Sequence, residues 1–191
     1  QASSEFELKD IQNNVTYKDL KIKIAPDLPL KITNFEHIDL RSSIKKNDYL
    51  KIVFFSRISP MKNLDFLLRV LQSINLKIEF SIYGPIEDIE YWNMCKKLIN
   101  KLPTNIKVKY FGEIKPDNVI PTLALYDLFI LPTKGENFGH VIIESLIAGT
   151  PVIISENTKW SLEETQSIKI IELNNFEKWT KTIKEWYDFD E

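Results

Sequence analysis

Residues 132–151 read Pro-Thr-Lys-Gly-Glu-Asn-Phe-Gly-His-Val-Ile-Ile-Glu-Ser-Leu-Ile-Ala-Gly-Thr-Pro, and they carry the clearest signal of secondary structure in the chain. A short apolar run precedes it, and Gly135 and Gly139 bracket a turn. Residues 140–148 are mostly apolar and are followed by Gly149. This pattern is typical of a strand, a tight loop, a helix and a further strand.

Glu144 is the unusual residue of the expected helix, because a helix this apolar should be buried on most sides. His140 lies four residues earlier and therefore on the same face. Burying an unpaired carboxylate costs on the order of several kcal/mol. We therefore expect Glu144 to face either a protein partner or a ligand.

Strands and helices alternate along the rest of the chain. Residues 1–20 are expected to be a linker or the remnant of an upstream domain, and residues 21–191 to form one domain. Because each parallel return needs a crossover, this order predicts an α/β fold with a doubly wound, mainly parallel, Rossmann-like sheet. We expect strands at residues 21–25, 50–56, 77–83, 106–111, 128–131, 152–155 and 168–171, and helices at residues 64–74, 87–102, 117–126, 140–148 and 175–187.

Composition excludes several classes of protein. Of the 191 residues, 43% are hydrophobic and 27% charged, and the net charge of -2 gives no electrostatic reason to expect a nucleic-acid partner. The single cysteine, Cys95, excludes an internal disulfide and a multi-cysteine zinc site, and we expect no metal. No apolar run approaches the roughly 20 residues of a transmembrane segment, and no signal peptide is visible, so a cytoplasmic location is expected. Because the chain begins with Gln1, we expect a fragment of a longer protein.

Glycines mark the joints between the expected elements. Gly84, Gly112 and Gly135 follow strands, and Gly139 precedes a helix. In an open α/β sheet, ligands bind outside the carboxyl ends of the strands, so the backbone at these glycines is placed to approach a ligand closely. Any one of them alone is equally typical of a tight turn.

Arg57 and Lys62 lie between an expected strand and a helix that Asn63 can cap. Two cations beside a helix amino terminus oppose the positive end of its dipole, by about 0.3 to 1 kcal/mol each. An anion held between them, such as a phosphate, would reverse that sign. The alternative is a solvated loop with two ordinary surface cations.

The loop before the central helix supplies a second set of polar groups. Backbone N–H groups of Phe138, Gly139 and His140 can point at the same anion. Glu144 can accept hydrogen bonds from a vicinal diol such as a ribose, and Glu136 from sugar hydroxyls. The alternatives are that Glu136 only complements the helix dipole and that His140 only pairs with Glu144 in the core.

These motifs together resemble those of a known family. Residues 57–62, the turn Tyr83-Gly84-Pro85 and the Glu-x(7)-Glu spacing within residues 132–151 are similar to the C-terminal, donor-binding half of retaining GT-B glycosyltransferases of the group 1, or family 4, type. The resemblance spans residues 21–191. It implies that a nucleoside diphosphate sugar, with UDP or GDP, is the donor substrate and that no cofactor is needed. It implies the following roles: Arg57 and Lys62 bind the diphosphate, Gly84 and His140 line the site, Glu136, Asn137, Phe138 and Gly139 hold the sugar, Glu144 binds the ribose, and the base rests near Gly112 and Ile114.

The resemblance also implies an activity. A glycosyl group would be transferred with retention to a glycan or lipid-linked acceptor in cell-surface polysaccharide synthesis, with Glu136, Arg57 and Lys62 as catalytic groups. The acceptor would be bound by an N-terminal domain that this chain lacks, and the full-length enzyme could associate peripherally with a membrane. The family often has glycine where this chain has Asn137. A sugar-nucleotide epimerase and a non-enzymatic, flavodoxin-like interaction domain remain as alternatives.

Overall fold

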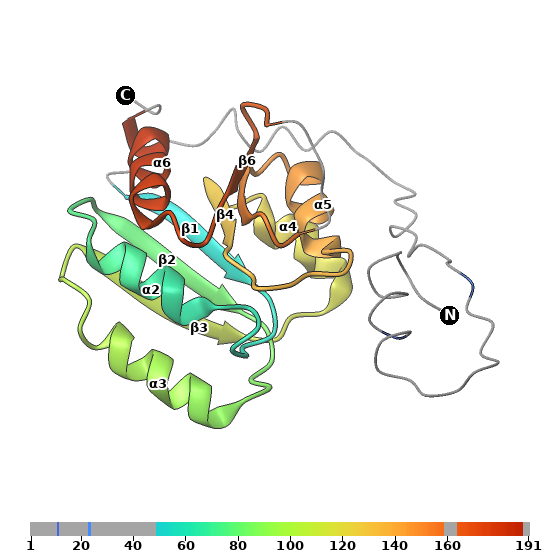
Figure 1. Cartoon of the computed structure of the whole chain (residues 1–191), viewed down its shortest axis with the longest axis horizontal. Helices are drawn as coiled ribbons and strands as arrows, with labels where there is room; N and C mark the ends of the chain where they lie inside the picture. Colours follow the sequence, from blue (N-terminus) through green and yellow to red (C-terminus); the bar gives the residue numbers. More distant parts are fainter. Residues whose placement is uncertain (1–10, 12–22, 24–48, 159–163, 189–191) are drawn as a thin grey trace.

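The computed structural model describes residues 11, 23, 49–158 and 164–188 (Figure 1). Strands and helices alternate along these residues, as the sequence predicts. The strands are β1 (Leu50–Phe55), β2 (Ile78–Tyr83), β3 (Ile106–Gly112), β4 (Leu128–Leu131), β5 (Val152–Ser155) and β6 (Ile168–Ile171). The helices are α2 (Leu64–Gln72), α3 (Ile89–Ile99), the 3-10 turn η1 (Pro116–Asn118), α4 (Val119–Leu123), α5 (His140–Ile147) and α6 (Phe176–Asp188).

The six strands form one sheet in the order β3-β2-β1-β4-β5-β6, and every neighbouring pair is parallel. The predicted doubly wound, Rossmann-like fold is therefore confirmed. From β1 the chain builds the sheet first toward β3 and then, from β4, in the opposite direction. The boundary between β1 and β4 is the position at which ligands bind in sheets of this kind.

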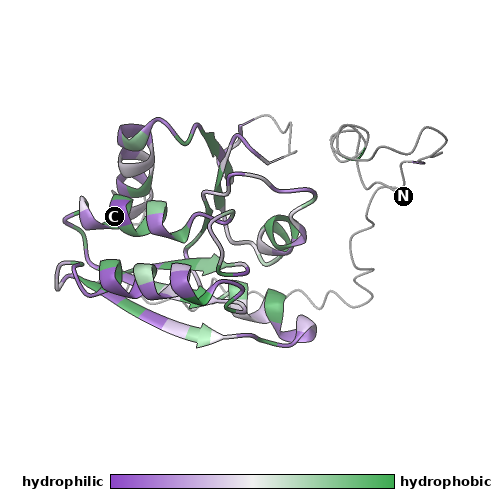
Figure 2. Ribbon diagram, turned by 60° about the horizontal axis from the view of Figure 1, so that its bottom comes forward, coloured by the Kyte–Doolittle hydropathy of each residue, from purple (hydrophilic) through white to green (hydrophobic). Residues whose placement is uncertain are grey.

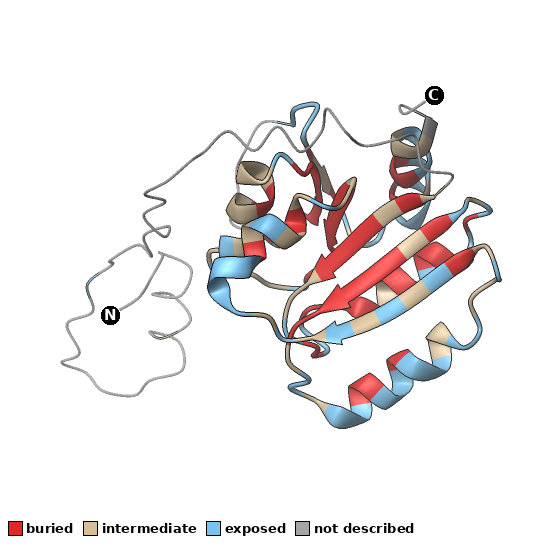
Figure 3. Cartoon of the chain, turned by 180° about the vertical axis from the view of Figure 1, so that it is seen from behind, coloured by how far each residue is buried: buried red, intermediate tan, exposed pale blue. Residues whose placement is uncertain are grey.

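Helices cover the two faces of the sheet, which explains the apolar runs of the central strands. Figure 1 shows α2 lying over the face of β1 to β3, and Figure 3, seen from behind, shows α4 and α5 on the other face. All residues of β4 and β5 are buried, because strands covered on both sides have no polar face. The helices alternate hydrophobic with hydrophilic residues, as Figure 2 shows. Their apolar faces can therefore pack on the sheet.

The closing helix packs onto α2 through aromatic rings. The Phe66 ring lies 5.5 Å from the Trp179 ring and 6.0 Å from the Phe176 ring, both edge to face. Trp179 is fully buried and its indole N–H donates to the Glu172 carbonyl oxygen. This contact fixes the last helix to the first β–α unit that the structure describes.

Several predicted details differ from the structure. Asn63 precedes α2 but has a left-handed backbone with φ 60°, and its side chain makes no capping hydrogen bond. The helix predicted at residues 117–126 is shorter, because η1 and α4 together end at Leu123. The predicted strand at residues 21–25 lies outside the described residues except for Lys23, which has no regular structure. Within the described ranges, no helix combines the length and the apolar character needed to cross a bilayer.

Candidate functional site

The loops that follow β1 and β2 are joined by backbone hydrogen bonds at the carboxyl edge of the sheet. The N–H of Ile58 donates to the Pro85 carbonyl oxygen at 2.8 Å. The Ile58 carbonyl oxygen accepts the N–H groups of Glu87 and Asp88, each at 3.2 Å. The residues next to Arg57 are therefore held by the loop that leads into α3.

Gly84 is required by this approach of the two loops. Its φ is 124°, and a Cβ atom there would lie 2.0 Å from the carbonyl oxygen of Ser56. The close backbone approach at Gly84 is thus to the end of β1. Direct contact of Gly84 with a ligand stays a prediction.

The loops that follow β1 and β4 are joined in a similar way. The carbonyl oxygen of Met61 accepts the Lys134 N–H at 2.8 Å and lies 3.2 Å from the hydroxyl of Thr133. On its other side, the β4 loop is tied to the loop after β5, because the Glu136 N–H donates to the Asn157 carbonyl oxygen at 3.1 Å. The sheet therefore brings three strand-end loops to one place.

Lys62 and Glu136 meet where the loops after β1 and β4 lie together. The Lys62 Nζ atom is 2.6 Å from Glu136 Oε2, and the two side chains are only 7% and 16% exposed. The interpretation of Lys62 as an ordinary surface cation is therefore wrong. Two of the predicted site residues, 74 positions apart in the chain, are in direct contact.

Arg57 has a carboxylate partner that the sequence did not indicate. Its Nη1 atom lies 2.5 Å from Glu87 Oε1, and both side chains are about half exposed. Arg57 and Lys62 thus each have an acidic partner, and the binding of an anion between the two cations stays a prediction. An incoming anion has to compete with Glu87 and Glu136.

The amino end of α5 contributes backbone groups to the same edge. Gly139 is the N-cap with φ 68°, and no side chain caps the helix there. A Cβ atom on Gly139 would lie 2.8 Å from Ile142 Cδ1 and 3.0 Å from Glu136 Cγ, so this glycine packs directly on the Glu136 side chain. The rings of Phe138 and His140 follow at 4.7 Å from each other.

Glu144 is half buried on the second turn of α5. Burial raises the pKa of its carboxyl group, and His140 acts in the opposite direction. His140 itself is exposed, so the interpretation of His140 as a core partner of Glu144 is wrong. The expectation that this helix is buried on most sides is also wrong, because Ile142 and Ser145 are its buried residues.

Gly112 and Ile114 lie beside Gly84 at the end of β3. The carbonyl oxygen of Gly112 accepts the Gly84 N–H at 2.8 Å, and Gly112 has a left-handed φ of 76°. Ile114 is partly buried and packs on the core. The predicted base-binding residues are therefore next to the loop after β2, which in turn contacts the loop that carries Arg57.

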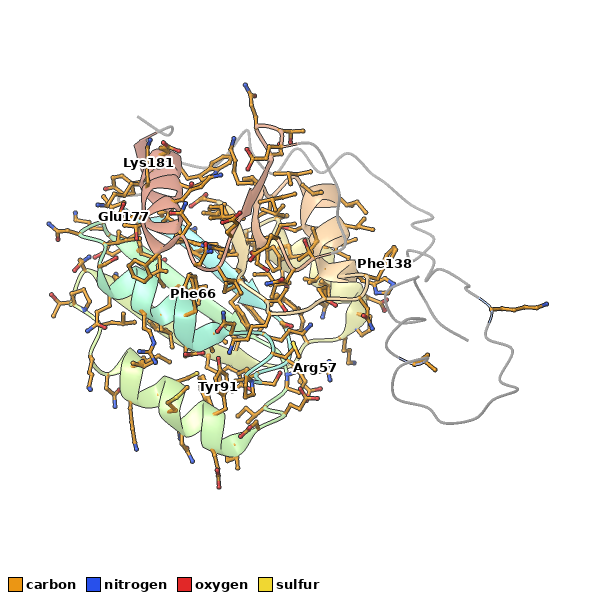
Figure 4. All side chains as sticks on the ribbon, viewed as in Figure 1. Arg57, Phe66, Tyr91, Phe138, Glu177 and Lys181 are labelled. Carbon is orange, nitrogen blue, oxygen red and sulfur yellow. The ribbon has the colours of Figure 1, made fainter. Side chains whose placement is uncertain are left out.

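The predicted residues share one end of the molecule. Figure 4 shows Arg57 and Phe138 at this end, well away from Glu177 and Lys181 on α6. Glu87, Thr133 and Asn157 complete the loop contacts and were missed by sequence reasoning. Their roles depend on contacts between loops distant in sequence, which spacing does not show, although the position of Thr133 two residues after β4 was a usable signal. Among the residues that the structure describes, no group of three or more acidic, histidine or cysteine side chains could hold a metal ion.

A parallel sheet whose cationic, acidic and glycine residues gather beyond its strand ends defines a Rossmann-like ligand-binding domain. The particular family follows from the sequence, which matches the family of glycosyl transferases group 1 over residues 36–188. The chain belongs to this family.

Individual relatives agree with this assignment. An uncharacterized glycosyltransferase of Methanocaldococcus jannaschii is 29% identical over 125 residues, which are 63% of this chain and 31% of that protein. A GDP-mannose-dependent alpha-(1-6)-phosphatidylinositol monomannoside mannosyltransferase of Mycobacterium tuberculosis is 28% identical over 60% of this chain and 32% of its own length. The chain thus spans about a third of the length of these curated relatives.

Solved structures show the same fold. Sucrose-phosphate synthase of Thermosynechococcus elongatus superposes with a TM-score of 0.74 and 16% identity, over 99% of this chain and 49% of that chain. HepE of Anabaena, in complex with UDP and glucose, superposes with a TM-score of 0.66 and 20% identity, over 72% and 38% of the two chains. These likenesses confirm that the fold is that of one half of a GT-B glycosyltransferase.

Proposed function

We propose that the chain is the donor-binding domain of a glycosyltransferase. The donor is a nucleoside diphosphate sugar with UDP or GDP, and transfer proceeds with retention to a glycan or lipid-linked acceptor. A second domain binds the acceptor, and the whole enzyme works in the cytoplasm, with a peripheral membrane contact where the acceptor is a lipid. The complex of HepE with UDP and glucose and the GDP-mannose dependence of the mycobacterial relative support this class of donor.

The contact between Lys62 and Glu136 carries the proposal. It brings a cation suited to a diphosphate within 2.6 Å of a carboxylate suited to sugar hydroxyls, in a setting where both side chains are largely buried. When the donor binds, the Lys62 ammonium moves its hydrogen bonds to the phosphate oxygens. Glu136 then accepts hydrogen bonds from the sugar. The pair thus marks the junction between the diphosphate and the transferred sugar.

Stabilisation of the leaving diphosphate is the chemical task of the other groups. Arg57 leaves Glu87 and binds the diphosphate with its guanidinium fork. The uncapped amino end of α5 adds the positive end of a helix dipole. Negative charge that grows on the leaving group is thereby stabilised without a metal, as in an oxyanion hole. Glu144, one turn further along α5, accepts hydrogen bonds from the ribose hydroxyls.

Isothermal titration calorimetry of the chain with UDP and with GDP tests the proposal. We expect one of the two nucleotides to bind, and Arg57→Ala or Glu144→Ala to weaken binding at least tenfold. Lys181→Ala is the matched control, because Lys181 is a largely exposed cation on α6. Absence of binding to both nucleotides, or equal binding by the wild type and both site variants, would refute the proposed function.

A further inference from the structure

Thr133 is the residue through which the loop after β4 is attached to its surroundings. It is completely buried. Its hydroxyl lies 2.7 Å from the Gly135 carbonyl oxygen and 3.2 Å from the Met61 carbonyl oxygen, and it accepts the Gly135 N–H at 3.2 Å. Its own carbonyl oxygen accepts the hydroxyl of Ser155, at the end of β5. The hydroxyl and the backbone carbonyl of Thr133 therefore connect the loop after β1, the loop after β4 and the end of β5.

The partners of Thr133 are the chain neighbours of the buried ion pair. Met61 precedes Lys62, and Gly135 precedes Glu136. None of the hydrogen bonds of Thr133 goes to either charged side chain, yet they hold the backbone on both sides of the 2.6 Å contact between Lys62 and Glu136. The spacing between the ammonium and the carboxylate thus depends on a hydroxyl that lies outside the pair.

We propose that Thr133 is a positioning residue that sets Glu136 for the sugar end of a nucleotide sugar. The inference rests on the proposed function, and it names a residue to which that function gives no role. Without the hydroxyl, the Gly135 N–H and carbonyl groups lose their partner. The loop then relaxes around Glu136, and small displacements of a positioning group cost much of its effect.

The nucleotide end of the ligand depends less on Thr133. Arg57 is fixed from the other side, where Ile58 is hydrogen-bonded to the loop after β2. Loss of the Thr133 hydroxyl should therefore weaken binding of the sugar end of the donor and leave binding of the nucleotide end unchanged. Affinity for the nucleotide sugar falls, and affinity for the nucleoside diphosphate stays.

The experiment compares Thr133→Val with Thr133→Ser in the whole chain. Valine keeps the volume and removes the hydroxyl, and serine keeps the hydroxyl. Calorimetric titrations use UDP, UDP-glucose, GDP and GDP-mannose, and the readout is the ratio of the two dissociation constants, sugar nucleotide over nucleotide. We expect Thr133→Val to raise this ratio about tenfold and Thr133→Ser to keep it within about twofold of the wild type.

Thr150→Val is the matched control, because it also removes a buried, hydrogen-bonded threonine hydroxyl but at a position away from the Lys62–Glu136 pair. Thr150 is also buried, and its hydroxyl donates to the Leu123 carbonyl oxygen at 2.8 Å, near the amino end of β5. This variant should lose stability without changing the affinity ratio. An equal change in Thr133→Val and Thr150→Val, or no change in either, would overturn the inference.

Two further outcomes are distinguishable. If the wild type binds none of the four nucleotides, the proposed function fails and the inference fails with it. If the wild type binds and Thr133→Val keeps the wild-type ratio, the inference alone fails. Should Thr133→Val not fold, Thr133→Cys replaces it, because the thiol keeps the volume and is a weaker hydrogen-bonding group. An unchanged ratio in Thr133→Cys then overturns the inference, and a raised ratio supports it.

Discussion

The Lys62 ammonium group lies 2.6 Å from the Glu136 carboxylate, and these side chains, 74 residues apart, are 7% and 16% exposed. Such a pair is weak evidence for stability as long as both partners are present, because desolvation offsets much of the attraction. Removal of one partner is different, since it leaves a charge that is poorly solvated and unpaired. A substitution of Lys62 or Glu136 alone should therefore lower the stability of the free protein as well as change the proposed binding site.

We expect Lys62→Met to lower the free energy of unfolding by about 3 kcal/mol, at the lower end of the range for broken buried pairs. The double variant Lys62→Met/Glu136→Gln should recover much of this loss, because no isolated charge remains. Urea unfolding of the single and double variants measures both values. A loss below about 1 kcal/mol in Lys62→Met would show that Glu136 is well solvated without its partner.

The exposed pair between Arg57 and Glu87 should behave in the opposite way. Both side chains are about half exposed, and ion pairs at the surface contribute at most about 1 kcal/mol. Arg57→Gln should therefore leave the free energy of unfolding nearly unchanged, while nucleotide affinity falls at least tenfold. Chemical unfolding and calorimetry of the same sample separate the two effects. Glu87→Gln is the control, because it removes the same ion pair and keeps the Arg57 guanidinium. A large loss of stability in Arg57→Gln would contradict the expectation.

Glu144 predicts a dependence of stability on pH. Its pKa in the folded protein is raised by burial above the ordinary value of 4.5, so the folded state holds this proton more tightly than the unfolded state. The contribution is favourable below the ordinary value and is lost as pH rises through the raised pKa. Glu144→Gln should remove this loss, and the variant should be at least as stable as the wild type at pH 7.

Unfolding curves of the wild type and Glu144→Gln between pH 4 and pH 7 measure this difference. The two curves should converge toward pH 4, where Glu144 is protonated in the wild type. The same substitution should weaken nucleotide binding under the proposed function, so stability and affinity change in opposite directions. Parallel stability curves over this pH range would show that Glu144 has an ordinary pKa.

The sequence predicted the six strands of the parallel sheet because the signal for each of them was local. Apolar runs such as residues 50–56 and 128–131 are typical of strands covered on both faces, and the structure buries most of β1 and all of β4. The helix after Gly139 was placed correctly, since glycine and the following apolar period mark its start. Which residues share the carboxyl edge also followed, because the topology alone decides it.

The pairing of charges could not be predicted, because it depends on how loops pack rather than on spacing. Arg57 and Glu87 are 30 residues apart, and no periodicity relates them. The exposure of His140 was missed for a similar reason. The elements that pack against α5 decide which of its faces is covered, and the apolar composition of the helix does not show which elements these are. Asn63 was predicted to cap α2 with its side chain. Instead its backbone adopts a left-handed conformation at the turn into α2, which asparagine tolerates.

Gly84 and Gly112 provide a final prediction, because both have a left-handed backbone and differ in the space around them. A Cβ atom on Gly84 would lie 2.0 Å from the Ser56 carbonyl oxygen, whereas a Cβ atom on Gly112 meets nothing within 4 Å. Gly112→Ala should therefore cost only the left-handed strain of alanine, about 1 to 2 kcal/mol. Gly84→Ala adds a collision with backbone that cannot rotate away, so we expect a loss above about 4 kcal/mol or failure to fold. Thermal unfolding of the two variants measures the difference, and equal losses would show that the β1 and β2 loops separate easily.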